Sequence, residues 1–596
     1  MIRHLLAPVF VLAASLLPAA VPLVNLVDDR TLFVVSVTDT PALLRGWDTS
    51  PLATTWNDPQ IVKFLAPLRD ELDVDEWDAD TKAATGLTVR ELLALAEGEA
   101  LFALPAFNFS TLESKTPPPF LLALEVGKQA DKIEKLLADS AEKKSIKEET
   151  ETFSGVTVKI RPLSSAEKSA DPDADVSAVP SSFAWAIVDG IWLISADKER
   201  VFAAIDAVKQ GGLDSSLGKS EAFLRTRQRA GEAQSLFYVN IPAIYPAVRD
   251  AVAAAKAKSE QAPNPMGLDP EAAFNALGLD ALGEAYMALR IDEKETRVDA
   301  GLRYTEERGI LKLIAYQPGP VAKPDWIPAK WPSVYTMRFS MSKFYAGLEE
   351  LLEEISPMMS GMAQGQIRAF NKNLGIDIKR DFIGSIGDDL VSAYAVPPGL
   401  EPGAVPAWQE MDQLISFSLV NEAAFIKSVD ALKKLAGPAA EQMFIKRDYL
   451  GHTLYTLNMP TMPDAPPARG FTYAIANGTF LIGIGSPGTV ENALQGMASP
   501  QGLFWKRDDV KAALADVPED AVAIQVQDLR VMMASLVETF VQLQAATAGE
   551  DQPKMLDVSA RPDAEVIARH WGVAGSSVTR TPEGIFSSAR FEHQKK

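Results

Sequence analysis

Two apolar runs joined by a two-residue turn occur twice in the chain. Residues 183–195 carry Asp189-Gly190 between the runs, and residues 471–483 carry Asn477-Gly478, 288 residues further on. Asp-Gly and Asn-Gly are strong hairpin signals because both turn residues must adopt a positive φ. A helical pattern follows each hairpin and ends near Val208 in the first case and Met497 in the second. The pattern therefore predicts two hairpins, each leading into a helix.

Further similarities recur in the same order along the chain. The matched segments are 86–93 plus 98–101 with 375–382 plus 387–390, 120–126 with 414–420, 153–155 with 449–451, 235–241 with 521–529, and 285–304 with 571–591. A period near 290 residues is too long for a solenoid and indicates two whole domains. We therefore predict a tandem duplication.

The strand patterns indicate the fold class. Near the end of the first copy, apolar and charged positions alternate: Val298, Ala300, Leu302 and Tyr304 against Arg297, Asp299 and Arg303. Such alternation is typical of an antiparallel sheet with one covered face. We predict an α+β protein of two tandem homologous modules, each a largely antiparallel sheet of about nine or ten strands with helices packed on one face.

The domain boundaries follow from the repeat and from proline. We assign residues 28–306 to the first module, 307–332 to a Pro-rich linker and 333–596 to the second module. Prolines at 318, 320, 324, 328 and 332 predict a stiff, extended segment. Loops rich in Pro, Ser or Asp, predicted to be surface spacers, lie at 105–119, 162–182, 396–408 and 458–470.

The N-terminal residues resemble a targeting segment. A short basic start precedes the apolar residues 5–17 and small residues at 18–20, so residues 1–20 are predicted to be a signal peptide. An uncleaved anchor reaching about residue 27 is the alternative, although Pro8, Pro18 and Pro22 disfavour a membrane helix. We expect export to the periplasm or the cell surface, with membrane contact only through this segment if it is uncleaved.

Composition removes several classes of function. The chain of 596 residues has 58 Lys+Arg against 79 Asp+Glu and a formal net charge of −21. An acidic surface repels phosphates, so we exclude nucleic acid as a partner. The chain has no cysteine, which excludes disulfides, thiolate metal sites and a Cys nucleophile.

A glycine string at residues 483–488 has the spacing of a dinucleotide-binding loop. The strand before it belongs to a hairpin and not to a parallel unit, and the first copy has Ser195 to Arg200 in its place. Pro487 explains the string as the start of a helix. We therefore predict no phosphate site there.

Histidine offers little for catalysis or metal binding. The four histidines are His4, His452, His570 and His593, and the first copy has Val156 where the second has His452. Neither a G-x-S-x-G elbow nor an H-E-x-x-H motif accompanies them. A Ser-His-Asp site at His452 or His570 stays open as an alternative.

Paired carboxylates are the strongest candidates for acid–base chemistry. Glu97 and Glu99 flank Gly98, and Asp388-Asp389 occupies the matched place in the second copy. Two carboxylates held about 5–10 Å apart with separated pKa values would suit hydrolysis of a glycosidic bond. Polar residues around a helix-ending glycine are the simpler interpretation.

Two other acidic segments are interpreted as solvated surface. They are the run from Asp70 to Asp80 and the calcium-loop-like Asp171, Asp173 and Asp175, where Val176 replaces the turn glycine and Ser182 the bidentate glutamate. Weak surface calcium binding is the alternative.

Two methionine-bearing segments have helical spacing: Met358, Met359 and Met362, and Met532, Met533, Leu536, Val537 and Phe540. Methionine suits adaptable apolar grooves, but such stripes are usually core, and we predict them as core.

The first copy resembles a known family in four segments. These are 190–196, the Leu217 to Phe223 element, the strand 235–240 and the turn 277–282. In them the chain resembles a widespread family of bacterial exported proteins known only as a domain of unknown function. The resemblance implies export and the α+β module, and it provides no catalytic residues.

We expect no catalytic, cofactor-binding or metal-binding residues. A whole fold is duplicated without a repeated polar constellation, which favours a non-enzymatic envelope protein that binds a ligand or a protein partner. One alternative is an exported carboxylate-dependent hydrolase, which requires two facing acids, one with a raised pKa. Another is a carrier of apolar ligands, which requires an apolar cavity. A structural or inhibitory partner protein would need an exposed apolar patch.

Overall fold

The computed structural model describes residues 21–71, 82, 87–105, 120–143, 145, 147–162, 182–259, 269–401, 404–435, 437, 443–457, 469–547 and 555–593. The predicted signal peptide, Asp171 to Asp175 and most of the predicted loops at 105–119, 162–182 and 458–470 lie outside this part, whereas the loop at 396–408 is described except for residues 402 and 403. The chain divides into two compact units, each described by itself below. Unit 1 comprises residues 1–41 and 80–244, and unit 2 comprises residues 42–79 and 245–596. These units do not follow the boundary at residue 306.

The described residues of unit 1 form eight antiparallel strands: β1 (Phe33–Val37), β2 (Ala100–Leu104), β3 (Leu121–Glu125), β4 (Glu149–Phe153), β5 (Val156–Pro162), β6 (Ser182–Val188), β7 (Ile191–Ser195) and β8 (Ser235–Asn240). They pair in the order β8-β1-β2-β3-β7-β6-β5-β4. The strand-pair register is continuous along β1, from Phe33 opposite Leu104 to Val37 opposite Ala100.

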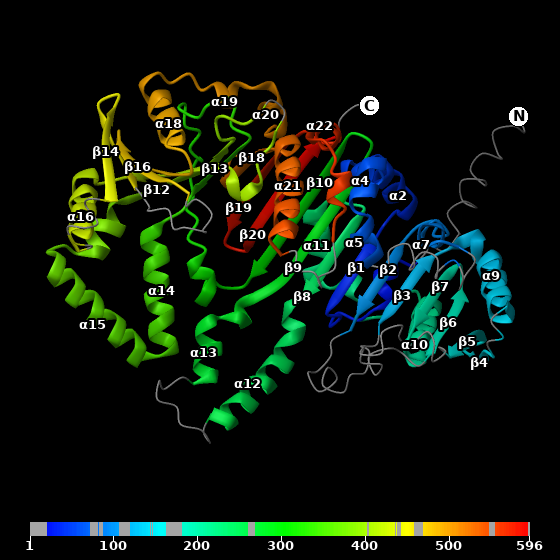
Figure 1. Ribbon diagram of the computed structural model, residues 1–596. Coiled ribbons are helices and arrows are strands. Elements are labelled where there is room, and N and C mark those ends of the chain that lie inside the picture. The colour runs from blue at the N-terminus through cyan, green and yellow to red at the C-terminus, as the bar shows by residue number, and fades with distance from the viewer. Residues whose placement is uncertain are drawn as a thin grey trace, which may run out of the picture. The chain divides into compact units, whose positions relative to one another are not determined.

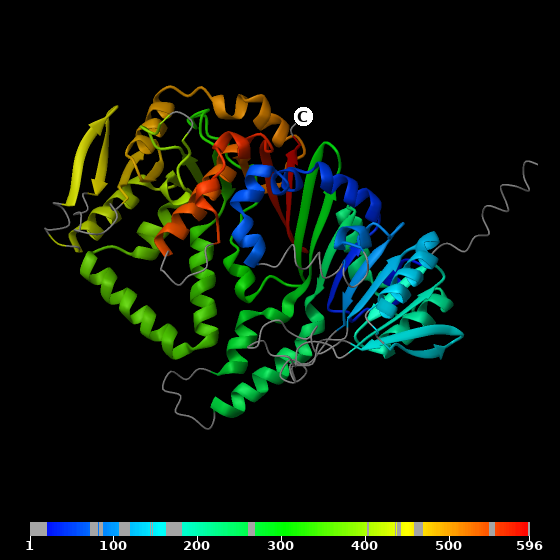
Figure 2. The same cartoon turned by 45° about the vertical axis from the view of Figure 1, so that its right-hand side comes forward.

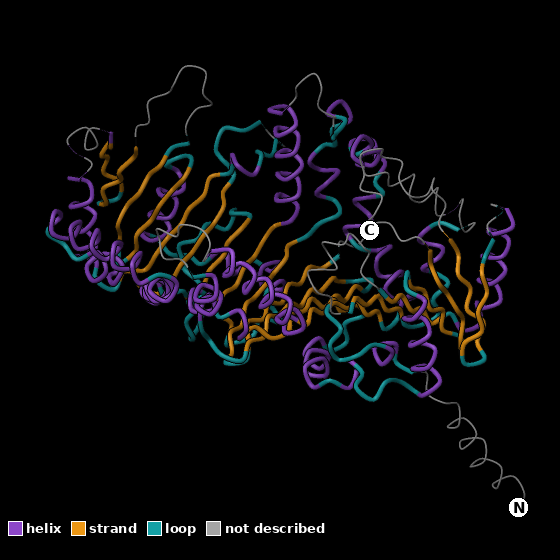
Figure 3. Tube along the Cα trace, turned by 90° about the horizontal axis from the view of Figure 1, so that it is seen from below, coloured by secondary structure: helices purple, strands orange, loops and turns teal. Residues whose placement is uncertain are grey.

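In unit 2 the part of the chain that the structure describes forms twelve antiparallel strands: β9 (Leu282–Ile291), β10 (Glu295–Tyr304), β11 (Ser333–Arg338), β12 (Ile386–Ala395), β13 (Asp412–Leu419), β14 (Phe444–Tyr449), β15 (His452–Leu457), β16 (Phe471–Ala476), β17 (Thr479–Ile484), β18 (Ala521–Asp528), β19 (Val573–Thr581) and β20 (Gly584–Glu592). The pairing order is β9-β10-β20-β19-β18-β11-β12-β13-β17-β16-β15-β14. Strands β11 to β18 therefore pair in the same order as β1 to β8. Figure 3 shows the strands lying side by side, with helices along them.

Helices connect many of these strands along the chain and are labelled in Figure 1 where there is room. They are α2 (Thr40–Thr49), α3 (Pro51–Trp56), α4 (Pro59–Phe64), α5 (Ala66–Glu71), α7 (Val89–Leu93), α9 (Ala130–Lys143), α10 (Lys198–Gln210), α11 (Glu221–Ala230), α12 (Tyr245–Ser259), α13 (Pro270–Leu277), α14 (Met341–Ile355), α15 (Pro357–Leu374), α16 (Glu422–Leu435), α18 (Gly488–Ala498), α19 (Leu503–Lys506), α20 (Asp508–Ala513), α21 (Leu529–Thr547) and α22 (Ala564–Ala568). The predicted α+β class with antiparallel strands is confirmed.

The two predicted hairpins are present with the expected turns. Asp189 and Gly190 have φ of 50° and 77°, and Asn477 and Gly478 have φ of 49° and 71°. The hairpins β6–β7 and β16–β17 lead into α10 and α18, as the pattern predicts. Local turn chemistry is therefore enough to fix these elements.

The prediction that helices cover one face of the sheet is wrong, because helices pack on both faces. In β17 the Phe480 ring lies 4.9 Å from that of Phe425 in α16. The next residue, Leu481, is fully buried in a core cluster with Val490 of α18. Adjacent strand residues point to opposite faces, so both faces of the sheet are covered.

The Pro-rich segment before β11 packs against the core of unit 2 through Ile327 and Trp331. Ile327 and Trp331 are 2% and 1% exposed in the core cluster of unit 2. The indole Nε1 of Trp505 donates a hydrogen bond to the Pro324 carbonyl at 3.0 Å. The segment is thus part of the core of unit 2.

The described N-terminal residues are anchored inside unit 1. Leu23 and Leu26 are 2% and 4% exposed. Leu213 N donates to the Asn25 carbonyl at 2.9 Å, and Leu217 N donates to that of Val27 at 2.9 Å. Apolar residues that would extend an anchor to residue 27 are therefore buried in protein. Within the described ranges, no helix combines the length and apolar character that crossing a bilayer requires.

Candidate functional site

The glycine string at 483–488 holds an internal carboxylate. Asp412, which is 4% exposed, accepts a hydrogen bond from Ser486 N at 2.9 Å, and the Ser486 hydroxyl donates to the same carboxylate. Gly485 has φ of +113°, and a Cβ there would lie 2.0 Å from Asp412 Oδ1. An anionic ligand at the start of α18 would meet this negative charge, although helix N-termini otherwise attract anions.

His570 belongs to a buried charged cluster. Its Nε2 lies 3.1 Å from Asp58 Oδ2, and Arg569 donates to the same oxygen. Asp58 is also the N-cap of α4, accepting from Gln60 N at 3.0 Å. Burial alone would raise the pKa of Asp58, but hydrogen bonds from Arg569, Gln60 N and His570 together lower it. The cluster fastens α4 to the end of α22, which is a structural task.

The other two described histidines lie elsewhere. His593 Nε2 lies 2.9 Å from Thr296 Oγ1, and burial lowers the pKa of His593. His452 is the first residue of β15 and lies opposite Tyr449 at the β14–β15 turn.

Glu99 lies next to Glu125, and the pKa of Glu99 is raised. Burial is the main cause of the raised pKa of Glu99, and the charge of Glu125 adds to it, whereas Arg227 opposes it. Each carboxylate is already held by backbone: Leu23 N donates to Glu99 at 2.7 Å, and Glu99 N donates to Glu125 at 3.0 Å. Glu97 points elsewhere, since it accepts from Lys128 N at 3.1 Å.

Asp388 and Asp389 share one cation. Arg338 lies 3.4 Å from each carboxylate, and each aspartate side chain is 39% exposed. This is a solvated ion cluster, in which each pairing contributes little energy.

The two methionine segments have different environments. Met532 is 5% exposed, as predicted for core, but Met358 and Met362 are 48% and 61% exposed, so the prediction is wrong there. The only residue of α15 that is buried, among those described, is Ser360. On α21, Leu536 and Phe540 are 39% and 49% exposed as well.

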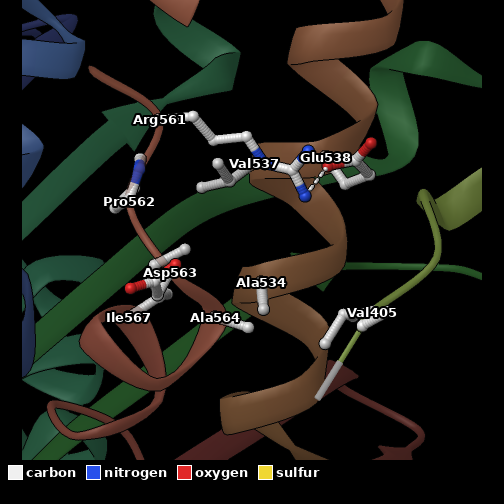
Figure 4. Close-up of a pocket in the computed structure, with 10 residues that line it drawn as sticks. Val405, Ala534, Val537, Glu538, Arg561, Pro562, Asp563, Ala564 and Ile567 are labelled. Atoms are coloured by element: carbon white, nitrogen blue, oxygen red, sulfur yellow. Dashed lines mark ion pairs between the residues drawn. The ribbon is translucent and has the colours of Figure 1, made fainter. Parts of the chain in front are cut away.

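A pocket of about 310 Å³ lies between α21, α22 and the segment before β13. Its lining residues are Ala404, Val405, Ala534, Val537, Glu538, Arg561, Pro562, Asp563, Ala564 and Ile567. Figure 4 shows the side chains of Ala534 and Ala564 facing each other across the space between the two helices. The size falls within the range of small-molecule sites.

The pocket has an apolar floor and a charged rim. Ala534 and Ile567 are 5% and 2% exposed and belong to a core cluster with Ile61 and Trp571. At the rim, Arg561 Nη2 lies 2.6 Å from Glu538 Oε2 (Figure 4). This arrangement suits an apolar ligand body with a small polar end.

Small side chains create this space. α21 is held in place by its buried residues and by Thr539 Oγ1, which accepts from Trp408 N at 2.8 Å. Alanines at 534 and 564, where larger residues would fill the gap, leave it open. The sequence pattern marked Val537 as part of a helix stripe but not the alanines, because only tertiary packing brings the two helices together.

In the described part of the chain, no group of acidic or histidine side chains could hold a metal ion. Comparison of the chain with protein-family models, curated proteins and solved structures finds no match.

Proposed function

We propose that this chain is a non-enzymatic binding protein of the bacterial envelope, and that it binds an apolar ligand between α21 and α22. The observation that carries the proposal is the pocket of about 310 Å³, which has an apolar floor and one ion pair at its rim. The ligand would place its apolar body against Ala534, Ala564 and Ile567.

The strand order supports a tandem duplication behind this function. The repeated order of β1–β8 and β11–β18 is what two homologous modules, residues 28–306 and 333–596, would produce. Export through a signal peptide at residues 1–20 completes the proposal, and the burial of Leu23 and Leu26 is compatible with cleavage before them.

The carboxylate hydrolase is the second candidate because Glu99 has a raised pKa next to Glu125. Both carboxylates already accept backbone hydrogen bonds, which favours a structural role for them. A hydrolase would lose its activity in Glu99→Gln, whereas a binding protein would keep its ligand.

Native mass spectrometry of the exported protein, compared with its denatured mass, tests the proposal. We expect an extra mass in wild type that is lost on denaturation and strongly reduced in Ala564→Leu, which fills the pocket. Ala545→Leu, at an exposed position of α21, is the matched control and should keep the extra mass. A bare wild-type mass, or an extra mass that A564L leaves unchanged, would contradict binding at this pocket.

A further inference from the structure

A second pocket lies between α12 and α13, and its volume is about 550 Å³. Figures 1 and 2 show these two helices side by side. The lining residues are Arg249, Val252, Ala253, Lys256, Ala257, Glu271, Phe274 and Asn275. The pocket is thus built from one long helix and the short helix that follows it.

One stripe of α12 faces this pocket. Arg249, Val252, Ala253 and Lys256 have the spacing i, i+3, i+4 and i+7, which places them on one helix face. Seven residues of helix extend over about 10 Å. Phe274 of α13, which is 7% exposed, provides the apolar floor. The stripe therefore has a cation at each end and an apolar stretch between them.

The two cations differ in their surroundings. Lys256 Nζ lies 2.5 Å from Glu271 and 3.8 Å from Asp269, so its charge is balanced within the protein. Arg249 is exposed and forms no ion pair or hydrogen bond with any of the residues that the structure describes. A guanidinium at the rim of an apolar pocket is suited to bind a carboxylate with two hydrogen bonds.

We propose that this pocket is a second binding site, specific for a monocarboxylate with an aliphatic chain. The carboxylate binds Arg249, and the chain lies along Val252 and Ala253 over Phe274. This site is separate from the pocket of α21 and α22, and it does not depend on the function proposed for that pocket.

The α21–α22 pocket provides an internal comparison. Both pockets follow a strand that leads into two helices and a further strand, β8–α12–α13–β9 and β18–α21–α22–β19. The ninth residue after the first strand is Arg249 in one case and Val537 in the other, and both line their pockets. Arg561, the guanidinium of the α21–α22 pocket, is paired with Glu538, whereas Arg249 has no such partner among the described residues. This difference distinguishes the α12–α13 pocket as an anion site.

Titration calorimetry with decanoate on the purified, delipidated full chain tests this inference. We expect one decanoate per chain, with 1-decanol and decyltrimethylammonium binding at least about tenfold more weakly, as expected for loss of a charge-assisted hydrogen bond. Arg249→Gln should weaken decanoate about tenfold or more, whereas Arg368→Gln, an exposed arginine of α15, removes the same charge and should leave binding unchanged.

Filling the pocket provides an independent readout. Ala253→Trp places a large side chain at an exposed lining position and should abolish decanoate binding, with Ala545→Trp as the control. Equal binding of decanoate and decanol, or unchanged decanoate affinity in R249Q, would overturn the inference. A564L should bind decanoate normally, so the outcome for this site is independent of the outcome for the α21–α22 pocket.

Discussion

At the scale of single residues, Asp58 is the buried carboxylate that links α4 to the residues after α22. Its side chain is 3% exposed and bridges Arg569 and His570. We expect Asp58→Asn to destabilise the protein by about 1–2 kcal/mol at pH 7, because a buried carboxylate loses its charge-assisted hydrogen bonds. The loss is limited because the Arg569 side chain is 53% exposed and stays solvated. The lowered pKa stabilises the fold above the ordinary value of 3.8 and ceases to do so as the pH falls through the folded-state pKa.

The measurement is urea denaturation of wild type and D58N at pH 7 and pH 3. The difference in unfolding free energy should shrink at the lower pH. Asp508→Asn, whose side chain is 99% exposed, is the control and should change little. A difference that is equal at both pH values would contradict the ionic role of Asp58.

Neutralising Glu97 and neutralising Glu99 should change the melting temperature in opposite directions. The raised pKa of Glu99 means that its ionisation opposes folding as the pH rises above the ordinary value of 4.5. The lowered pKa of Glu97 means that its ionised form stabilises the fold above that value. We therefore expect Glu99→Gln to raise the melting temperature at pH 7 and Glu97→Gln to lower it.

Thermal unfolding of both variants at pH 7 and pH 4 checks this pair. In E99Q the side-chain amide oxygen can still accept the hydrogen bond that Leu23 N donates to Glu99 in wild type, so the comparison isolates charge. Both differences should diminish at pH 4, and differences of the same sign would refute the electrostatic explanation.

At the scale of elements, the turn residues predicted the hairpins correctly, but the sequence did not predict which helices pack on which face of the sheet. The Asp189-Gly190 and Asn477-Gly478 hairpins need only two positive φ values, which the sequence itself dictates. Coverage of both sheet faces depends on where α16 and α18 pack, and alternation along one strand contains no such information. The sequence did not predict the two pockets either, because each is formed by side chains of two helices that only tertiary packing brings together.

Substitutions of Met358 in α15 and Met532 in α21 test whether the first is a surface residue and the second a core residue. We expect Met358→Gln to change the unfolding free energy by less than about 0.5 kcal/mol, since the side chain is 48% exposed. Met532→Ala should cost about 2–4 kcal/mol, since its side chain is 5% exposed. Chemical denaturation measures both changes, and a large loss in M358Q would place that residue in a packed interface.

The Pro-rich segment is a further test at this scale. We expect Trp331→Ala to destabilise unit 2 by about 3–5 kcal/mol, because the indole is 1% exposed in the core. Pro320→Ala, at an exposed position of the same segment, should have a small effect. Denaturation followed by tryptophan fluorescence distinguishes the two, and an unchanged midpoint in W331A would restore the interpretation of the segment as a spacer.

At the scale of the whole molecule, the matched sequence segments recur in one order, and β11 to β18 pair in the same order as β1 to β8. The boundaries of the two compact units could not be predicted from these segments. The predicted boundary at residue 306 follows the repeat, whereas unit 2 includes residues 42–79 as well as 245–596. Similarity between two stretches of sequence does not determine compactness, which depends on which segments meet in space. Long-range pairs such as Asp58 with His570 leave no local pattern to detect.

The inclusion of residues 42–79 in unit 2 has a consequence for how the chain reaches its native state. Asp58 and its partner Arg569 are 511 positions apart in sequence. During synthesis Asp58 of the α4 N-cap therefore cannot contact Arg569 until almost the entire polypeptide has emerged. Closing so long a loop slows folding and prolongs the lifetime of incomplete intermediates. Unit 2 cannot be completed from the N-terminus onward, so a protease added during synthesis should still cut residues 42–71 until the C-terminal end of the chain has appeared.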